Sequence, residues 1–171
     1  TKEVIELDCP KMEWLREWVL DHIVDNPHMR VIVWCVYNAE VYRITRELRR
    51  LLNDGGVAYL NGSVNNEVMI TNIKQSFNSR NPNGIRVLVC QIDKMYEGHN
   101  LQAGDVNIYF SNSFSYMKRA QSEDRSHRKG RNEAVQYIDL LCESTVDVDI
   151  FEALMQKQDF AAKVTPGTIS G

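Results

Sequence analysis

Residues Arg30-Val-Ile-Val-Trp-Cys-Val-Tyr37 set the fold class, because apart from Arg30 and Cys35 they are all β-branched or aromatic. A strand that is apolar on both sides is typical of a parallel sheet whose two faces are both covered. A second run of this kind, Ile85-Arg-Val-Leu-Val-Cys-Gln91, lies further along the chain. Together the two runs predict the buried centre of an α/β domain.

Strand-like and helix-like segments alternate on both sides of these runs. An amphipathic helix is expected from about Pro10, with apolar residues Met12, Leu15, Val19 and Ile23 on one face. Further helices are expected over residues 38–53, 65–77 and 146–163, and further strands over 57–60, 105–110 and 134–141. This alternation predicts a mostly parallel central sheet with helices on both faces. In such sheets the working residues gather at the carboxyl ends of the strands.

The composition is that of an ordinary globular domain. The chain has 171 residues, of which 43% are hydrophobic and 25% charged, with a formal net charge of −3. This length is enough for one core-bearing domain. No apolar run approaches the roughly 18 residues that cross a bilayer, so no membrane partner is expected. The first residue is Thr1 rather than Met, and we therefore expect the chain to be part of a longer protein.

The four cysteines, Cys9, Cys35, Cys90 and Cys142, are far apart and form no C-x-x-C pair. Zinc and redox motifs are therefore unsupported, and we expect buried free thiols in a reducing compartment. The histidines have no paired Cys, Asp or Glu at the spacing of metal ligands, so no metal site is expected in this chain.

The most informative segment for function is Tyr116-Met-Lys-Arg-Ala-Gln-Ser-Glu-Asp-Arg-Ser-His-Arg-Lys-Gly-Arg131. It holds six cations and two anions, a local net charge of +4 inside a chain of net charge −3. Charge that gathers against the overall trend indicates a polyanionic ligand, such as a nucleotide phosphate or nucleic acid. On charge alone, a solvated helix face is the simpler explanation.

The spacing within this segment favours a phosphate site. Gln121, Arg125 and Arg128 lie at i, i+4 and i+7, so on a helix they project from one face. Gly130 is expected to end the helix just beyond Arg128. Guanidinium groups at the end of a rigid element suit phosphate oxygens, because arginine stays charged and binds with a planar fork.

The order Gln121-Ser-Glu-Asp-Arg-Ser-His-Arg-Lys-Gly130 resembles motif VI of superfamily 2 helicases and translocases. Its form is similar to the Gln-Ala-Glu-Asp-Arg-Ala-His-Arg-Ile-Gly-Gln of Swi/Snf-type and related phage helicases, with Arg131 where Gln is commoner. The resemblance implies catalytic roles for Arg128, as an arginine finger on the γ-phosphate, and for Arg125, in support of the same charge. It also implies nucleotide binding by Gln121 and Asp124.

A second segment, Val89-Cys-Gln-Ile-Asp-Lys-Met-Tyr-Glu-Gly-His-Asn-Leu101, resembles motif V of the same superfamily. Gly98 would let the backbone pass close to the nucleotide, and Asn100 offers a donor and an acceptor to a ribose hydroxyl or to the partner domain. The family usually has Ser or Thr near Gln91, and we expect the Gln91 amide to donate to a DNA phosphate in its place. Glu97 is a second departure and receives no role.

A third segment, Val57-Ala-Tyr-Leu-Asn-Gly-Ser63, resembles the strand and turn by which the second motor domain of the family approaches nucleic acid. Asn61, Gly62 and Ser63 could donate to phosphate from backbone and hydroxyl groups. Turn chemistry explains the same three residues equally well. In the helix expected before this segment, arginines 43, 46, 49 and 50 are expected on the solvated side, or as an extension of a basic surface.

The sequence has neither a G-x-x-x-x-G-K-[ST] phosphate loop nor an acidic run that would hold magnesium. With the resemblance, this implies the second, three-layer RecA-like domain of a two-domain motor over residues 1–164, followed by a flexible tail over 165–171. ATP and Mg²⁺ would be held mainly by an N-terminal RecA-like domain of the same protein. The isolated chain is therefore expected to be inactive.

The implied partner is DNA, single- or double-stranded, and RNA stays open as an alternative. The implied location is the cytoplasm for a bacterial or phage-encoded protein and the nucleus for a eukaryotic one. Two other functions remain open. One is a non-catalytic nucleic-acid-binding or regulatory module of similar α/β fold. The other is an unrelated α/β nucleotide-binding or interaction domain.

Overall fold

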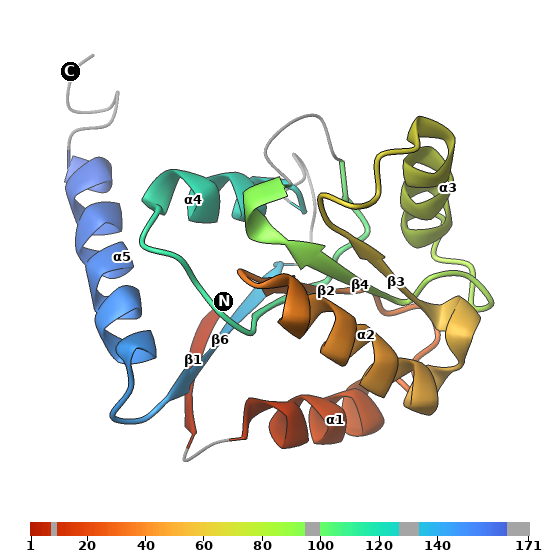
Figure 1. Cartoon of the computed structure of the whole chain (residues 1–171), viewed down its shortest axis with the longest axis horizontal. Helices are drawn as coiled ribbons and strands as arrows, with labels where there is room; N and C mark the ends of the chain where they lie inside the picture. The colour runs from red at the N-terminus through yellow and green to blue at the C-terminus, as the bar shows by residue number, and fades with distance from the viewer. Residues whose placement is uncertain (8–9, 95–99, 127–133, 164–171) are drawn as a thin grey trace.

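The computed structural model describes residues 1–7, 10–94, 100–126 and 134–163 (Figure 1). Its strands are β1 (Lys2–Leu7), β2 (Val31–Cys35), β3 (Val57–Leu60), β4 (Val87–Gln91), β5 (Val106–Tyr109) and β6 (Gln136–Cys142). Its α-helices are α1 (Lys11–His22), α2 (Asn38–Leu52), α3 (Glu67–Asn78), α4 (Tyr116–Asp124) and α5 (Val146–Lys163). Two short 3₁₀ helices, η1 (Asp54–Gly56) and η2 (Ile92–Lys94), precede β3 and follow β4.

The strands form one six-stranded sheet in the order β1-β6-β5-β2-β4-β3, and every pairing is parallel. β2 lies between β4 and β5, with Val33 opposite Val89 on one side and opposite Ile108 on the other. The first sequence run thus forms a central strand, and the predicted three-layer α/β fold is confirmed. The order reverses between β2 and β5, which is the position where sheets of this kind carry ligands at their carboxyl ends.

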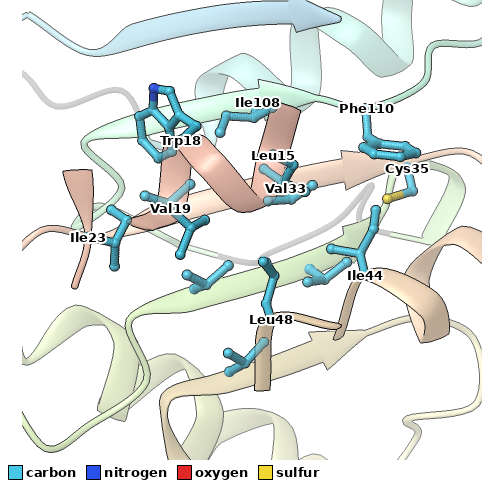
Figure 2. Close-up of a cluster of buried hydrophobic side chains, with 14 of the residues drawn as sticks. Leu15, Trp18, Val19, Ile23, Val33, Cys35, Ile44, Leu48, Ile108 and Phe110 are labelled. Carbon is cyan, nitrogen blue, oxygen red and sulfur yellow. The ribbon is translucent and has the colours of Figure 1, made fainter. Parts of the chain in front are cut away.

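Helices cover both faces of the sheet (Figure 1). β2 is buried throughout because its alternate side chains enter two separate cores. Val33 and Cys35 pack under α1 and α2 with Leu15, Ile44 and Leu48, as Figure 2 shows. On the opposite face, the alternate residues of β2 join a second core that includes Phe77 of α3.

The N-terminal strand β1 was not expected from the sequence pattern. It pairs with β6 along its whole length, from Lys2 opposite Tyr137 to Leu7 opposite Cys142. The side chains of residues 2–4 are exposed, so the segment lacks the buried apolar pattern that predicts a strand. Its position at the sheet edge depends on backbone pairing with β6, which a local sequence pattern does not reveal.

Helix α4 is shorter than predicted, because it ends at Asp124 rather than beyond Arg128. The Arg125 N–H donates to the Ser122 carbonyl at 3.2 Å, and the Arg125 carbonyl accepts from Leu101 N–H at 3.0 Å. The end of the helix is therefore a tighter 3₁₀-type turn. The Arg125 carbonyl accepts its hydrogen bond from the neighbouring loop. Arg128 and Gly130 lie outside the described residues, as do Gly98 and the expected tail 165–171.

The cysteines only partly match the expectation of free thiols. Cys35 and Cys90 are free and buried, as predicted, and burial raises the pKa of both thiols. Cys142 is disulfide-bonded. The prediction was wrong for this residue, because the spacing of cysteines in a sequence does not show which of them the fold brings together.

Within the described ranges, no helix is long and apolar enough to span a bilayer. The same ranges contain no group of three or more His, Cys, Asp or Glu residues placed to hold a metal ion.

Candidate functional site

The three motif segments meet at the carboxyl edge of the sheet, around η2. Asp93 accepts an ion pair from Lys118 of α4, with Nζ and Oδ1 separated by 2.8 Å. On the other side of η2, Lys94 lies against the turn after β3, since a Cβ added to Gly62 would be 3.1 Å from Lys94 Cε. One turn of 3₁₀ helix thus joins the segment after β3 to the charged helix α4. Sequence reasoning missed Asp93 and Lys94, although both lie inside the quoted second motif.

The turn after β3 is held by Asn61, whose side chain is buried and fully hydrogen-bonded. Its Nδ2 donates to Asn38 Oδ1 and to Tyr42 Oη, each at 3.1 Å. Its Oδ1 accepts from the backbone N–H of Ser63 at 3.1 Å and from Ser63 Oγ at 2.6 Å. This geometry favours a positioning role for Asn61, while Gly62 and Ser63 are the exposed members of the turn.

Tyr42 is a further member of this site that the sequence did not indicate. Its hydroxyl lies 3.4 Å from Ser63 Oγ and also accepts from Asn61. The hydrogen bond with Ser63, followed by that with Asn61, lowers the pKa of the Tyr42 phenol from its ordinary value. Tyr42 therefore joins the turn to helix α2, in addition to the hydrogen bond between Asn61 and Asn38.

Gln91 ends β4 with its side chain buried, at 8% exposure. Its Nε2 donates to the carbonyl of Val36 at 3.2 Å, which ties the end of β4 to the end of β2. Its Oε1 is buried without a hydrogen-bond partner among the described residues. A buried carbonyl oxygen of this kind normally accepts a hydrogen bond. The Gln91 Oε1 atom could therefore accept one from a further donor. Donation from Gln91 to DNA stays a prediction.

The ends of β2 and β5 are joined beside the point where the strand order reverses. Ser111 Oγ accepts from the Val36 N–H at 2.8 Å and donates to Glu40 Oε1 at 2.6 Å. The same Glu40 oxygen accepts from the Tyr37 N–H at 3.3 Å, so Glu40 also caps the start of α2. This network fixes the central part of the carboxyl edge, and no sequence motif pointed to it.

One cation of the charged segment is structural. Arg119 is buried at 3% exposure, and its two terminal nitrogens bind the two carboxylate oxygens of Asp139 at 2.6 and 2.8 Å. Its Nε donates to Glu123 at 3.0 Å, and its guanidinium lies 3.5 Å from the centre of the Tyr109 ring. Arg119 therefore anchors α4 to β5 and β6, and its charge is already neutralised.

The predicted nucleotide-binding residues lie at the end of α4 and beside it. Gln121 and Arg125 are half-buried, and Asp124 is exposed. Asn100 is exposed and directly precedes Leu101, whose N–H donates to the Arg125 carbonyl. The structure therefore brings Asn100 close to Arg125. The predicted partners Gly98 and Arg128 lie outside the described residues, so the complete constellation stays a prediction.

Comparison with known proteins supports the fold. No family model matches the chain. The chain is 27% identical over 158 residues to Helicase swr1 of Schizosaccharomyces pombe, across 92% of this chain. It is similar in structure to the C-terminal part of the Fun30 ATPase domain, with a TM-score of 0.67 and 21% identity over 83% of this chain and 44% of that chain. It is also similar to the Pyrococcus furiosus Hef helicase domain, with a TM-score of 0.64 and 20% identity over 85% of this chain and 28% of that chain.

The chain spans 12% of the length of the curated relative, so the activity of a whole protein does not transfer to it directly. The likeness to swr1 and Fun30 agrees with the Swi/Snf-type part of the sequence resemblance, whereas nothing here bears on the phage-type part. What the comparisons give is the architecture: the described residues have the same fold as the RecA-like domains of these helicase and ATPase structures.

Proposed function

We propose that this chain is the second motor domain of an ATP-dependent DNA helicase or translocase of the Swi/Snf type. The observation that carries the proposal is the meeting of the three motif segments around η2. Asp93 contacts α4 and Lys94 contacts the turn after β3, so a nucleotide contact and a nucleic-acid contact would share one rigid element. A motor needs such a connection, because a change at the nucleotide must move the grip on the strand.

In this proposal, ATP and Mg²⁺ are held mainly by a first motor domain, because the sequence of this chain has no phosphate loop. Arg128 acts as the arginine finger on the γ-phosphate, and Arg125 supports the same charge. Gln121, Asp124, Gly98 and Asn100 would line the nucleotide from this side of the cleft. An arginine finger contributes roughly 10³–10⁵ in rate by stabilising the charge of the transferring phosphoryl group.

The DNA grip is proposed for the turn after β3 and the end of β4. Gly62 and Ser63 are exposed and could donate to a phosphate, while Asn61 holds the turn in shape. Gln91 lies at the end of β4, next to η2 in sequence. When the cleft closes on ATP, η2 and the turn would move together, and opening after hydrolysis would release them.

Two preparations test the proposal: this chain alone, and the full-length protein that contains it. We expect no ATP hydrolysis by the isolated chain, and hydrolysis by the full-length protein that DNA stimulates. Single-stranded DNA, duplex DNA and RNA should be compared as stimulants at equal nucleotide concentration. Appreciable hydrolysis by the purified chain alone would contradict the two-domain proposal. DNA binding by the full-length protein without hydrolysis would support the non-catalytic alternative.

A further inference from the structure

The outer side of α2 carries a hollow that shares only Tyr59 with the three motif segments. It has a volume of about 410 Å³ and lies between α2, η1 and β3. We call it the α2 groove and define it by the residues Tyr42, Arg46, Arg49, Arg50, Asp54 and Tyr59. Three arginines and one carboxylate give this groove a local excess of positive charge in a chain whose net charge is −3.

The arginines of the α2 groove continue along the helix. Arg43, Arg46 and Arg50 lie at i, i+3 and i+7, and all three are exposed. Among the residues that the structure describes, Arg43 and Arg46 have no ion-pair partner within 4.0 Å. Arg50 pairs with Glu47 at 3.6 Å in the same helix, and an exposed pair of this kind contributes little. The stripe is thus a row of guanidiniums available to an external anion.

The groove also has a rigid floor. Arg49 donates from Nε and Nη2 to the carbonyl of Val57, each at 3.2 Å, which fixes its guanidinium beside β3. Tyr42 and Tyr59 meet edge to face, with ring centres 5.4 Å apart and an angle of 87° between the planes. A fixed arginine beside one exposed and one half-buried aromatic ring, Tyr42 and Tyr59, forms the kind of surface that binds phosphates together with sugars or bases.

The α2 groove continues into the turn after β3 through Tyr42. This residue lines the groove, and its hydroxyl is hydrogen-bonded to Asn61 and lies 3.4 Å from Ser63 Oγ. A nucleic-acid strand that reaches the turn would therefore meet the groove as its next contact. The position of the groove and its positive charge both favour a nucleic-acid ligand.

We propose that the α2 groove binds the phosphate backbone of nucleic acid, as an extension of the contact at the turn after β3. Arg46 and Arg50 contact the phosphates, and Tyr42 presents its ring to the strand. The contact reads charge and not sequence, because arginine stripes bind backbone oxygens through Coulombic attraction. The inference rests on the proposed function for the presence of a strand at the turn.

The test measures the affinity of the 171-residue chain for fluorescently labelled duplex and single-stranded DNA by anisotropy, over a series of salt concentrations. The variant is the double substitution Arg46→Glu and Arg50→Glu. We expect a loss of affinity of at least about tenfold, and a salt dependence that is shallower by about one unit for each lost phosphate contact. The matched control is Lys74→Glu on α3, which packs on the opposite face of the sheet. The control should bind with nearly unchanged affinity and salt dependence.

Thermal unfolding of each variant, followed by circular dichroism, must show that the folds are intact. Unchanged DNA affinity in a folded double variant would overturn the proposal. Lys74→Glu changes the net charge by −2 and the double variant changes it by −4. A loss of log affinity in Lys74→Glu that is half the loss in the double variant, or larger, would therefore also overturn the proposal, since the effect would then be one of net charge. Poly-glutamate that binds the wild type and loses affinity in the double variant, with DNA binding unchanged, would assign the groove to acidic polypeptides instead. ATP hydrolysis by the full-length protein is measured separately. A failure of the proposed motor function can therefore be distinguished from a failure of DNA binding at the α2 groove.

Discussion

The two edges of the sheet use their arginines in opposite ways. At the amino edge, Arg30 precedes β2 and is completely buried, and its guanidinium donates to main-chain carbonyls that include those of Phe77 and Asn81. Its neighbour Arg80 donates to both carboxylate oxygens of Asp105, at 3.0 and 2.7 Å. At the carboxyl edge, Arg125 is half-buried and Lys94 is exposed at the surface. The amino edge therefore binds the protein to itself, whereas the carboxyl edge is where we propose that charge meets a ligand.

The pKa of Arg30 reflects how deeply its guanidinium is buried at the amino edge. Burial, and then the neighbouring guanidiniums of Arg80 and Arg86, lower its pKa to about 10, against the opposing effect of Asp105. Burial of the guanidinium is offset by the hydrogen bonds that it donates to several backbone carbonyls, which would otherwise lack donors. A buried, saturated arginine is thus a structural tie, whatever motif it lies near.

Arg119 shows that this rule also holds inside the charged segment of α4. It belongs to the same run as Arg125, but it is saturated by Asp139 and Glu123 and packed on Tyr109. A count of charges treats the two arginines alike, whereas burial separates them, since Arg119 is 3% exposed and Arg125 is half-buried. Substitutions at saturated arginines should therefore cost stability, and substitutions at exposed cations should cost function.

The largest effect on stability is expected for Arg119→Ala. The substitution leaves Asp139 buried without its partner, which costs about 3–5 kcal/mol in comparable buried pairs. The free energy of unfolding from urea titration measures this loss. The matched control is Lys118→Ala, whose pair with Asp93 is 40% and 37% exposed and should contribute no more than about 1 kcal/mol. Equal losses in the two variants would remove the distinction between saturated and exposed cations.

A smaller loss is expected for Arg30→Ala at the amino edge. Truncation removes the donors of several buried carbonyls, at about 1–3 kcal/mol for each group that stays without a partner, and water can enter to replace some of them. We expect a net loss of roughly 2–3 kcal/mol on this basis. Urea titration measures it, and DNA affinity per folded molecule should be unchanged. A folded Arg30→Ala protein with impaired DNA binding would show that the two edges are not separate in function.

The smallest effect on stability is expected for Ser63→Ala in the turn after β3. Ser63 is exposed, and its backbone N–H still donates to Asn61 Oδ1 after the substitution. The free energy of unfolding should therefore change by no more than about 0.5 kcal/mol. DNA affinity should nevertheless fall several-fold if the hydroxyl donates to a phosphate. Asn61→Ala provides the contrast, with a loss of stability of about 1–2 kcal/mol because it removes a buried hydrogen-bonded group. Unchanged DNA affinity in both variants would remove the turn from the proposed grip.

The parts of the fold that depend on local pattern could be predicted from the sequence. The runs that form β2 and β4 are buried throughout, and α5 spans the predicted residues 146–163. β1 was missed because backbone pairing with β6 holds it, and the early end of α4 depends on a contact with Leu101. The disulfide of Cys142 was missed for the same reason, since it depends on proximity in space.

The site could be predicted as a set of segments but not as a set of contacts. The rule that ligands meet the carboxyl ends of parallel strands placed the motif segments on one edge. It could not show that Asp139 of β6 lies opposite Tyr109 of β5 and neutralises Arg119 from there. Nor could it show that the Asn61 amide is fully hydrogen-bonded, by its oxygen to Ser63 within the turn and by its nitrogen to Asn38 and Tyr42 of α2. Both facts depend on the register between distant segments.

The most direct test of the central claim is DNA-stimulated ATP hydrolysis by the full-length protein with Arg128→Ala. Lys74→Ala on α3 is the matched control, and ATP affinity is measured in parallel on both variants. We expect turnover to fall by roughly 10³-fold or more in Arg128→Ala, with nearly unchanged ATP affinity. Turnover and ATP affinity of the control should be close to those of the wild type. Unchanged turnover in Arg128→Ala would contradict the central claim.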